Sequence, residues 1–138
     1  MFTIVRHDKI NHKDLFRQGL IYYNMKKFRK DLMGASSIPS ILSILRNGDT
    51  YGYDINKQLR EASEGRIDWK EGSLYPILKK MEDLKYIKSY WEMGDSDRPR
   101  KYYKITATGK KAMDESREEL IDMVAIMNKL WNPQTDSI

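Results

Sequence analysis

EGSLYPILKKMEDL, residues 71–84, carries the strongest helical pattern in the sequence. Its apolar side chains recur at intervals of three and four residues, which places them on one face of a helix. Pro76 has no backbone N–H to donate, so it is tolerated at low cost only near the first turn. The helix is therefore predicted to begin between Glu71 and Ser73. Its apolar face consists of Leu74, Ile77, Leu78, Met81 and Leu84.

Two shorter helical patterns precede this segment. The first predicts a helix over residues 37–46, capped by Ser36 or Ser37, with Pro39 in its first turn. The second predicts a helix over residues 51–62, in which apolar side chains are spaced by four, four and three residues. The three patterns together predict three consecutive short helices.

The period changes to two in the next part of the chain. Alternating side chains over residues 87–92 and 101–105 predict two strands, and the turn-rich stretch between them predicts a β-hairpin. The alternation places Tyr103 on the buried face and Tyr102 on the exposed one. Pro99 cannot donate to a ladder and is expected to stay out of its central part.

A single long helix is predicted over residues 107–131, with Thr106 or Thr108 as its N-cap. Its apolar stripe is too long to be buried by one small domain, so we expect a second copy of the chain to cover it. The predicted fold is mainly α with a small β-hairpin (α+β): a winged helix-turn-helix followed by a long C-terminal dimerisation helix. The stripe, and hence the predicted dimer interface, comprises Met113, Leu120, Val124, Met127 and Trp131.

Composition limits the classes of function. The 138 residues include 25 basic and 20 acidic side chains, which gives a net charge of +5, and no cysteine. The lack of cysteine excludes a disulfide scaffold, an iron–sulfur cluster and a cysteine-ligated zinc site. Residues 66–104 hold ten basic and seven acidic side chains, so nucleic acid is the expected partner of this part. The apolar runs are too short for a membrane-spanning helix, and we expect a cytoplasmic protein.

Three segments together carry a resemblance to a known family. YGYDI, residues 51–55, resembles the YGYE(I) signature of PadR-type transcriptional regulators. EGSLYPIL, residues 71–78, resembles the EGTLYPIL of their recognition helix, and RPRKYYKIT, residues 98–106, resembles the (G)RPRKYYxLT of their wing. Gly109 falls where the family has the glycine of TxxG. The segments follow one another in the family's order and spacing, over roughly residues 30–131.

The resemblance implies a homodimer that binds a palindromic operator and is often released by a small molecule. The short chain with one C-terminal helix is similar to the small PadR subfamily, which includes multidrug-responsive repressors. The sequence departs from the pattern at Asp54, where the family has Glu, and at Asp97, where an acid replaces a glycine. Residues 1–29 have no clear counterpart.

Two surfaces are expected to contact DNA. The face of residues 71–84 opposite the apolar stripe is expected to lie in the major groove, and the arginine-bearing wing suits the minor groove or phosphates. For both surfaces the alternative is an ordinary solvated face, and Tyr53 is left open between a phosphate contact and packing. The predicted DNA-binding residues are Tyr53, Ser73, Tyr75, Pro76, Lys79, Lys80, Arg98, Arg100, Lys101 and Tyr102, whereas Tyr51 is predicted to lie in the core.

No catalytic constellation is present in the sequence. Ser73 has no base at helical spacing, and His7 and His12 are five residues apart with no adjacent cluster of acidic residues, so they do not make a metal site. We therefore expect no enzyme, no metal and no cofactor. The expected function is sequence-specific, repressive DNA binding, and the alternative is a winged-helix adaptor that binds protein and not DNA. A small apolar effector at the dimer interface is a further expectation, with Trp69 and Trp91 left open between ligand contact and packing.

The family-like part of the sequence also predicts how the chain is divided. We expect a DNA-binding domain over 30–106, a dimerisation helix over 107–131 and a tail over 132–138. Residues 1–29 are expected to be a partly flexible extension, with a marginal helix over about 13–33. Asn24-Met25-Lys26-Lys27 is typical of a translation start. Residues 1–24 are therefore left open as an upstream extension absent from the cellular protein.

Overall fold

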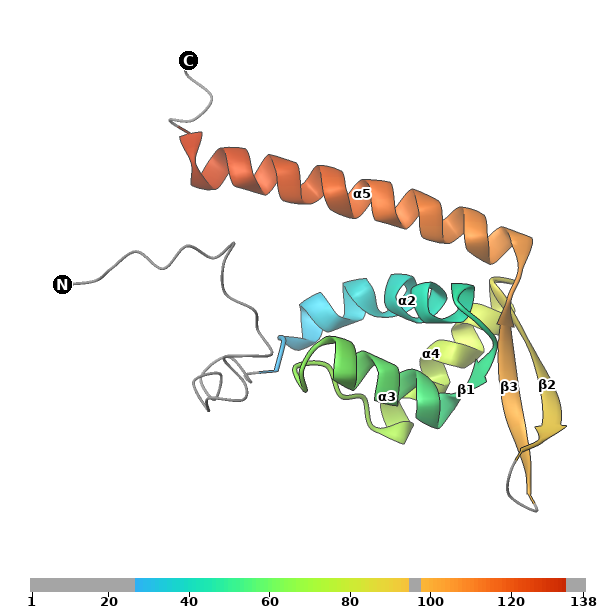
Figure 1. Cartoon of the computed structure of the whole chain (residues 1–138). Coiled ribbons are helices and arrows are strands. Elements are labelled where there is room, and N and C mark those ends of the chain that lie inside the picture. The colour runs from blue at the N-terminus through green and yellow to red at the C-terminus, as the bar shows by residue number, and fades with distance from the viewer. Residues whose placement is uncertain (1–26, 95–97, 134–138) are drawn as a thin grey trace.

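The computed structural model describes residues 27–94 and 98–133, and the expectations for residues 1–24 and for the end of the tail lie outside them. Three helices pack together, a small sheet closes one end of this unit, and a long helix lies along α2 (Figure 1). This architecture confirms the predicted mainly α fold with a small β-sheet and a long C-terminal helix. The elements are α2 (Lys30–Arg46), β1 (Thr50–Tyr51), α3 (Gly52–Ala62), α4 (Glu71–Asp83), β2 (Ile87–Met93), β3 (Pro99–Ile105) and α5 (Ala107–Trp131).

The apolar face of α4 supplies the centre of the core. Leu74, Leu78 and Met81 are buried, as the spacing predicts, and α4 begins at Glu71. Leu84 is an exception, because it caps the end of the helix and remains substantially exposed. Trp69 is buried in the same core, which assigns it to packing. The other buried apolar residues are Ile41, Leu42, Leu45, Ile55, Leu59, Ile87, Tyr103, Ile105 and Met113.

Helix α2 begins about two turns earlier than predicted, at Lys30, so the prediction of an N-cap at Ser36 or Ser37 is wrong. Both serines lie inside the helix and donate to carbonyls of the preceding turn: Ser36 Oγ to Leu32 O at 2.9 Å, and Ser37 Oγ to Gly34 O at 2.8 Å. Back-bonding of this kind lets serine remain in a helix interior. Pro39 therefore sits in mid-helix, where it withholds one backbone donor.

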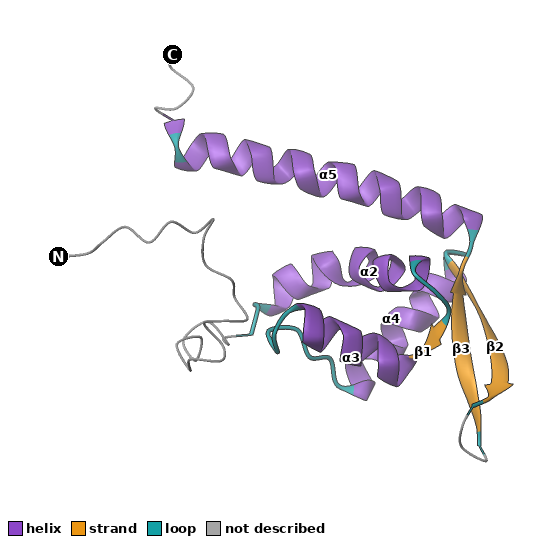
Figure 2. Ribbon diagram, viewed as in Figure 1, coloured by secondary structure: helices purple, strands orange, loops and turns teal. Residues whose placement is uncertain are grey.

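The sheet contains a third strand that the sequence pattern did not reveal. β3 lies between β1 and β2, and all pairs are antiparallel (Figure 2). Two residues are too short for any periodicity, which is why β1 was missed. Pro99 pairs with Met93 at the outer end of the hairpin, beyond the reach of β1. Tyr103 is buried as predicted, but Tyr51 is only half-buried, because β1 is an edge strand.

Helix α5 has the predicted bounds, and Thr106 is its N-cap, with Oγ1 accepting from Gly109 N at 3.0 Å. Met113 was predicted to face a second copy of the chain, and this is wrong. Its side chain is buried in the core of its own protomer, because the first turns of α5 pack against the helical unit. The other residues of the predicted interface begin at Leu120, and they are exposed or, for Met127, half-buried.

Within residues 27–94 and 98–133, no helix has the combination of length and apolar composition that a membrane crossing needs.

Gly109 provides a test of the packing of α5. A Cβ at this position would overlap the carbonyl oxygen of Tyr86 and lie 2.9 Å from Cγ1 of Ile105. We therefore expect Gly109→Ala to lower the free energy of unfolding by about 1–3 kcal/mol in urea titrations, as overpacking of a core does. Gly34→Ala is the matched control, because nothing lies within 4 Å of a Cβ there. It should raise stability by about 0.5–1 kcal/mol. Equal effects of the two substitutions would contradict the close approach of α5 to Tyr86.

Candidate nucleic-acid interface

A hollow lies where α3, α4 and the β2–β3 wing meet. Its volume is about 490 Å³, and we call it the corner hollow. Aromatic and cationic side chains from several elements surround it. It is lined by Tyr51, Gly52, Tyr53, Tyr75, Trp91, Arg100 and Lys101.

Tyr75 is held in the corner hollow by its contact with Gly52. A Cβ on Gly52 would lie 3.0 Å from the Tyr75 hydroxyl and 3.2 Å from Cζ, so the ring lies against the first residue of α3. The ring is half-exposed in spite of this contact. Tyr75 therefore presents one ring face and its hydroxyl in a defined position, and glycine at residue 52 makes that position accessible.

A row of tyrosines supports Arg100, which also lines the corner hollow. Its guanidinium lies 4.5 Å from the ring centroid of Tyr51, within the range of a cation–π contact. The Tyr51 ring meets Tyr102 edge-on at 5.5 Å, and Tyr102 stacks on Tyr90 at 5.8 Å. The Tyr90 hydroxyl donates to Asp49 at 2.7 Å, and this hydrogen bond raises the pKa of Tyr90 to about 12. Arg100 is thus positioned by aromatic contacts, and Tyr102 is half-buried as a support.

Two of the predicted DNA-binding lysines have acidic partners within the chain. Lys79 Nζ lies 3.0 Å from Oδ1 of Asp83, and the hydrogen bond raises the pKa of Lys79. Lys101 Nζ lies 3.6 Å from Oε1 of Glu82. Each phosphate that either lysine binds must compete with a carboxylate. An exposed pair of this kind is worth little, so the competition at Lys79 is weak.

The remaining predicted residues are exposed on two neighbouring elements. Ser73, Pro76 and Lys80 project from α4, and Arg98 immediately precedes β3 at the outer end of the wing. Tyr53, which the sequence left open, is 65% exposed at the start of α3, so it is not packed in the core. Of the predicted residues, the structure brings Tyr53, Tyr75, Arg100 and Lys101 together around the corner hollow.

Trp91 was left open between ligand contact and packing. Its indole is 66% exposed and forms one wall of the corner hollow. The alternation of β2 groups Trp91 with the buried Ile87, but the strand extends beyond the core, so the same face becomes exposed. The sequence could have indicated the exposure of Trp91 only through an estimate of how many positions along β2 the small core can cover.

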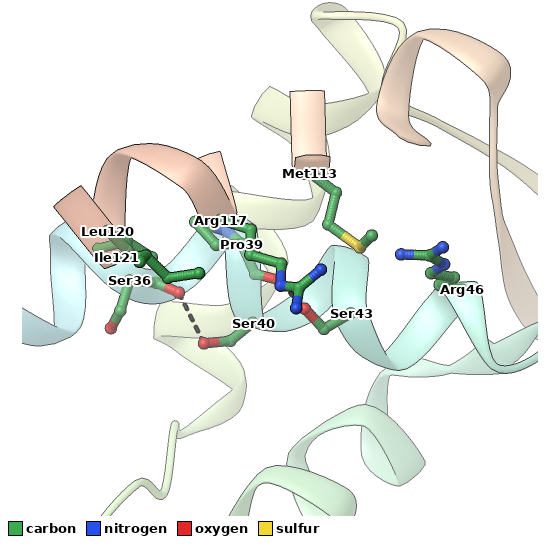
Figure 3. A pocket seen from close by; sticks show the side chains of 9 residues that line it. All are labelled: Ser36, Pro39, Ser40, Ser43, Arg46, Met113, Arg117, Leu120 and Ile121. Carbon is green, nitrogen blue, oxygen red and sulfur yellow. Dashed lines mark hydrogen bonds between the residues drawn. The ribbon is translucent and has the colours of Figure 1, made fainter. Parts of the chain in front are cut away.

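A second hollow lies between α2 and α5 (Figure 3). Its volume is about 440 Å³, and Pro39, Met113, Leu120 and Ile121 supply its apolar lining. Two guanidinium groups border it, and Arg46 lies 3.5 Å from Asp114. Serines 36, 40 and 43 complete the lining. We call this the α2–α5 groove. Among the described residues, no group of three or more His, Cys, Asp or Glu side chains could hold a metal ion.

The contact between Tyr75 and Gly52 can be tested by a double-mutant cycle. Gly52→Ala should destabilise the protein, because the new methyl group displaces the Tyr75 ring. On a Tyr75→Ala background the same substitution should be neutral or stabilising, since alanine is the better helix former. Urea unfolding should give a coupling free energy of at least about 0.5 kcal/mol. Additive effects of the two substitutions would contradict the contact.

Comparisons with known proteins agree with this arrangement. Residues 41–115 match the transcriptional regulator PadR-like family. The chain is 35% identical to a transcriptional regulator from Clostridium thermocellum, with a TM-score of 0.67 over 72% of this chain and 97% of that one. It is 39% identical to a PadR family transcription regulator from Clostridium difficile R20291, with a TM-score of 0.62 over 70% and 98% of the two chains. The negative transcriptional regulator PadR of Bacillus subtilis is 30% identical over 76 residues, which are 55% of this chain and 42% of that one.

The matched region runs from α2 to the first turns of α5 and includes the whole corner hollow. Members of this family regulate transcription by binding DNA and are not enzymes. The chain belongs to the PadR-like family of transcriptional regulators.

Proposed function

We propose that the chain is a repressor that binds a two-fold symmetric operator as a homodimer. The corner hollow carries this proposal. It lies between α4, the candidate recognition helix, and the wing, and exposed rings and cations line it. A helix in the major groove and a wing on the neighbouring backbone would leave one DNA strand between them. The repressive direction is supported by the similar Bacillus subtilis protein, which is a negative regulator.

In this proposal the contacts divide by type. Tyr53 and Arg100 bind phosphates of the strand seated in the corner hollow, and Lys79 and Lys80 bind phosphates along α4. Ser73 and Tyr75, on the exposed side of α4, are the candidates for contacts to base edges. The proposed DNA-contacting surface also includes Arg98 and Lys101 of the wing, Pro76 of α4 and the supporting ring of Tyr102.

The second half of α5 supports the proposal of a homodimer. Val124 is 59% exposed and Trp131 is 69% exposed. Exposed apolar surface of this extent along one helix marks a protein interface. The exposed apolar residues of α5 also include four that are not part of the predicted stripe: Ile121, Met123, Ile126 and Leu130.

A small apolar effector fits the same region. The α2–α5 groove shares Leu120 with the proposed interface, so a molecule bound there would contact both the helical unit and the dimer helix. Such a molecule could change the angle between the two and thereby the spacing of the α4 helices. We therefore expect the effector to lower the affinity for the operator. We also expect Ile121→Asp to weaken the binding of the effector.

Salt dependence tests DNA binding directly. Selection from a random duplex library with the full chain should recover a two-fold symmetric sequence, and the logarithm of affinity should fall linearly with the logarithm of salt. We expect Arg100→Ala to reduce this slope by about one unit, because one phosphate contact is lost. Lys129→Ala, on the polar side of α5, should leave the slope unchanged. A chain that enriches no sequence and binds no duplex at low salt would be the protein-binding adaptor instead.

The dimer is tested separately. Replacement of Val124 and Met127 by Glu should give monomers in analytical ultracentrifugation, because four buried carboxylates cannot be paired in the interface. The control is Ala125→Glu with Lys129→Gln, which changes the charge equally on the polar side and should remain dimeric. If the Val124 and Met127 variant sediments as a dimer, α5 is not the interface.

A further inference from the structure

The outer half of the wing bears apolar side chains on the face that continues from the core. Along β2 and β3 this face runs outward from Ile87, Tyr103 and Ile105, which are buried. Beyond them it carries Trp91 and then Met93, which is 61% exposed. Met93 lies directly opposite Pro99, itself exposed, in the last pair of the ladder. The wing thus ends its ladder on an apolar pair.

Cations flank this apolar pair in the sequence, but Arg100 points to the opposite face of the hairpin, where it lies across from Glu92. Arg98 precedes Pro99 in the chain and is exposed, and Arg100 follows it and is supported on the Tyr51 ring. The pair is also continuous with the corner hollow, since Trp91 lies two residues from Met93 on the same face. An occupant of this face of the wing must therefore offer apolar surface to Met93 and Pro99.

We infer that Met93 and Pro99 form an apolar wedge that enters the DNA minor groove, partly unstacks one base step and kinks the operator. The inference rests on the proposed function, because it takes the wing to lie against DNA. Narrow minor grooves concentrate negative potential and attract arginine, and apolar side chains between base pairs kink a duplex by about 20–90°. Pyrimidine–purine steps unstack most easily, so such a step is expected beneath the wing.

The two side chains suit this task in different ways. The proline ring fixes its own backbone torsion, so little conformational entropy is lost when it is placed in the groove. The methionine side chain is unbranched and polarisable, and it adapts to an irregular apolar gap. Neither side chain carries a charge, so the wedge adds bending without adding a phosphate contact.

The test uses the full chain and a duplex of about 40 base pairs carrying the sequence recovered by selection. The gel mobility of circularly permuted fragments carrying the same sequence reports bending, and 2-aminopurine at successive adenines of the duplex reports unstacking. The native chain should bend the duplex by at least about 20° and raise 2-aminopurine emission at one step in each half-site. Met93→Gln should reduce both signals. Met93→Leu, which keeps an apolar side chain, should retain them.

The outcomes separate this inference from the proposed function. Met93→Gln should leave the salt slope unchanged, because it removes no cation. A native complex that forms with a straight duplex and unchanged 2-aminopurine emission would overturn the wedge and leave the repressor intact. Failure to bind any duplex would overturn both. If Met93→Gln changes the sedimentation of the protein without DNA, the apolar pair is a contact between protein chains and the wedge is wrong.

Discussion

One junction, between the end of α4 and the start of α5, holds the parts of this protein in a fixed relation. Thr106 Oγ1 donates to Lys85 O at 2.6 Å and accepts from Gly109 N, while Thr106 N donates to Tyr86 O at 3.0 Å. Tyr86 N in turn donates to Met81 O, in the last turns of α4. The junction therefore links α4, both long strands and α5 through a few short bonds. Gly109 is required because α5 passes so close to Tyr86 that a side chain would collide.

This constraint gives the DNA-facing side its geometry. The junction joins α4 to the wing, and contacts within the chain position the side chains in the hollow between them. Tyr75 rests on Gly52, and Arg100 rests on Tyr51. Preorganised contacts lose less freedom on binding than flexible ones. The long α5 leaves the same junction, so a dimer formed through its distal half would transmit any change of its angle to both recognition helices.

The sequence predicts the elements well and their relations less well. The apolar periods of α4 and α5 are long and regular, and both helices were predicted nearly to the residue. The start of α2 was predicted too late, because Pro39 was placed in the first turn and the preceding serines were interpreted as caps. Serine back-bonding inside a helix leaves no periodic signal that would have corrected this. β1 is too short to show alternation. Met113 belongs to the same stripe as Val124, and only the tertiary packing shows that one faces inward and the other outward. The carboxylate partner of Lys101 and the exposure of Trp91 likewise depend on where the core ends. The pair of Lys79 and Asp83 differs, because its i,i+4 spacing within one helix is a signal that the sequence does contain.

The central claim is that α4 and the wing of each protomer bind one face of the same duplex together. Hydroxyl-radical footprinting of the full chain on the selected duplex tests it most directly, because cleavage reports each sugar along the backbone. The account predicts two equivalent half-sites about 34–36 Å apart, each with protection on both sides of the major groove that α4 enters and in the adjoining minor groove. A footprint with one half-site, or with protection at the major groove and unaltered cleavage beneath the wing, would contradict it.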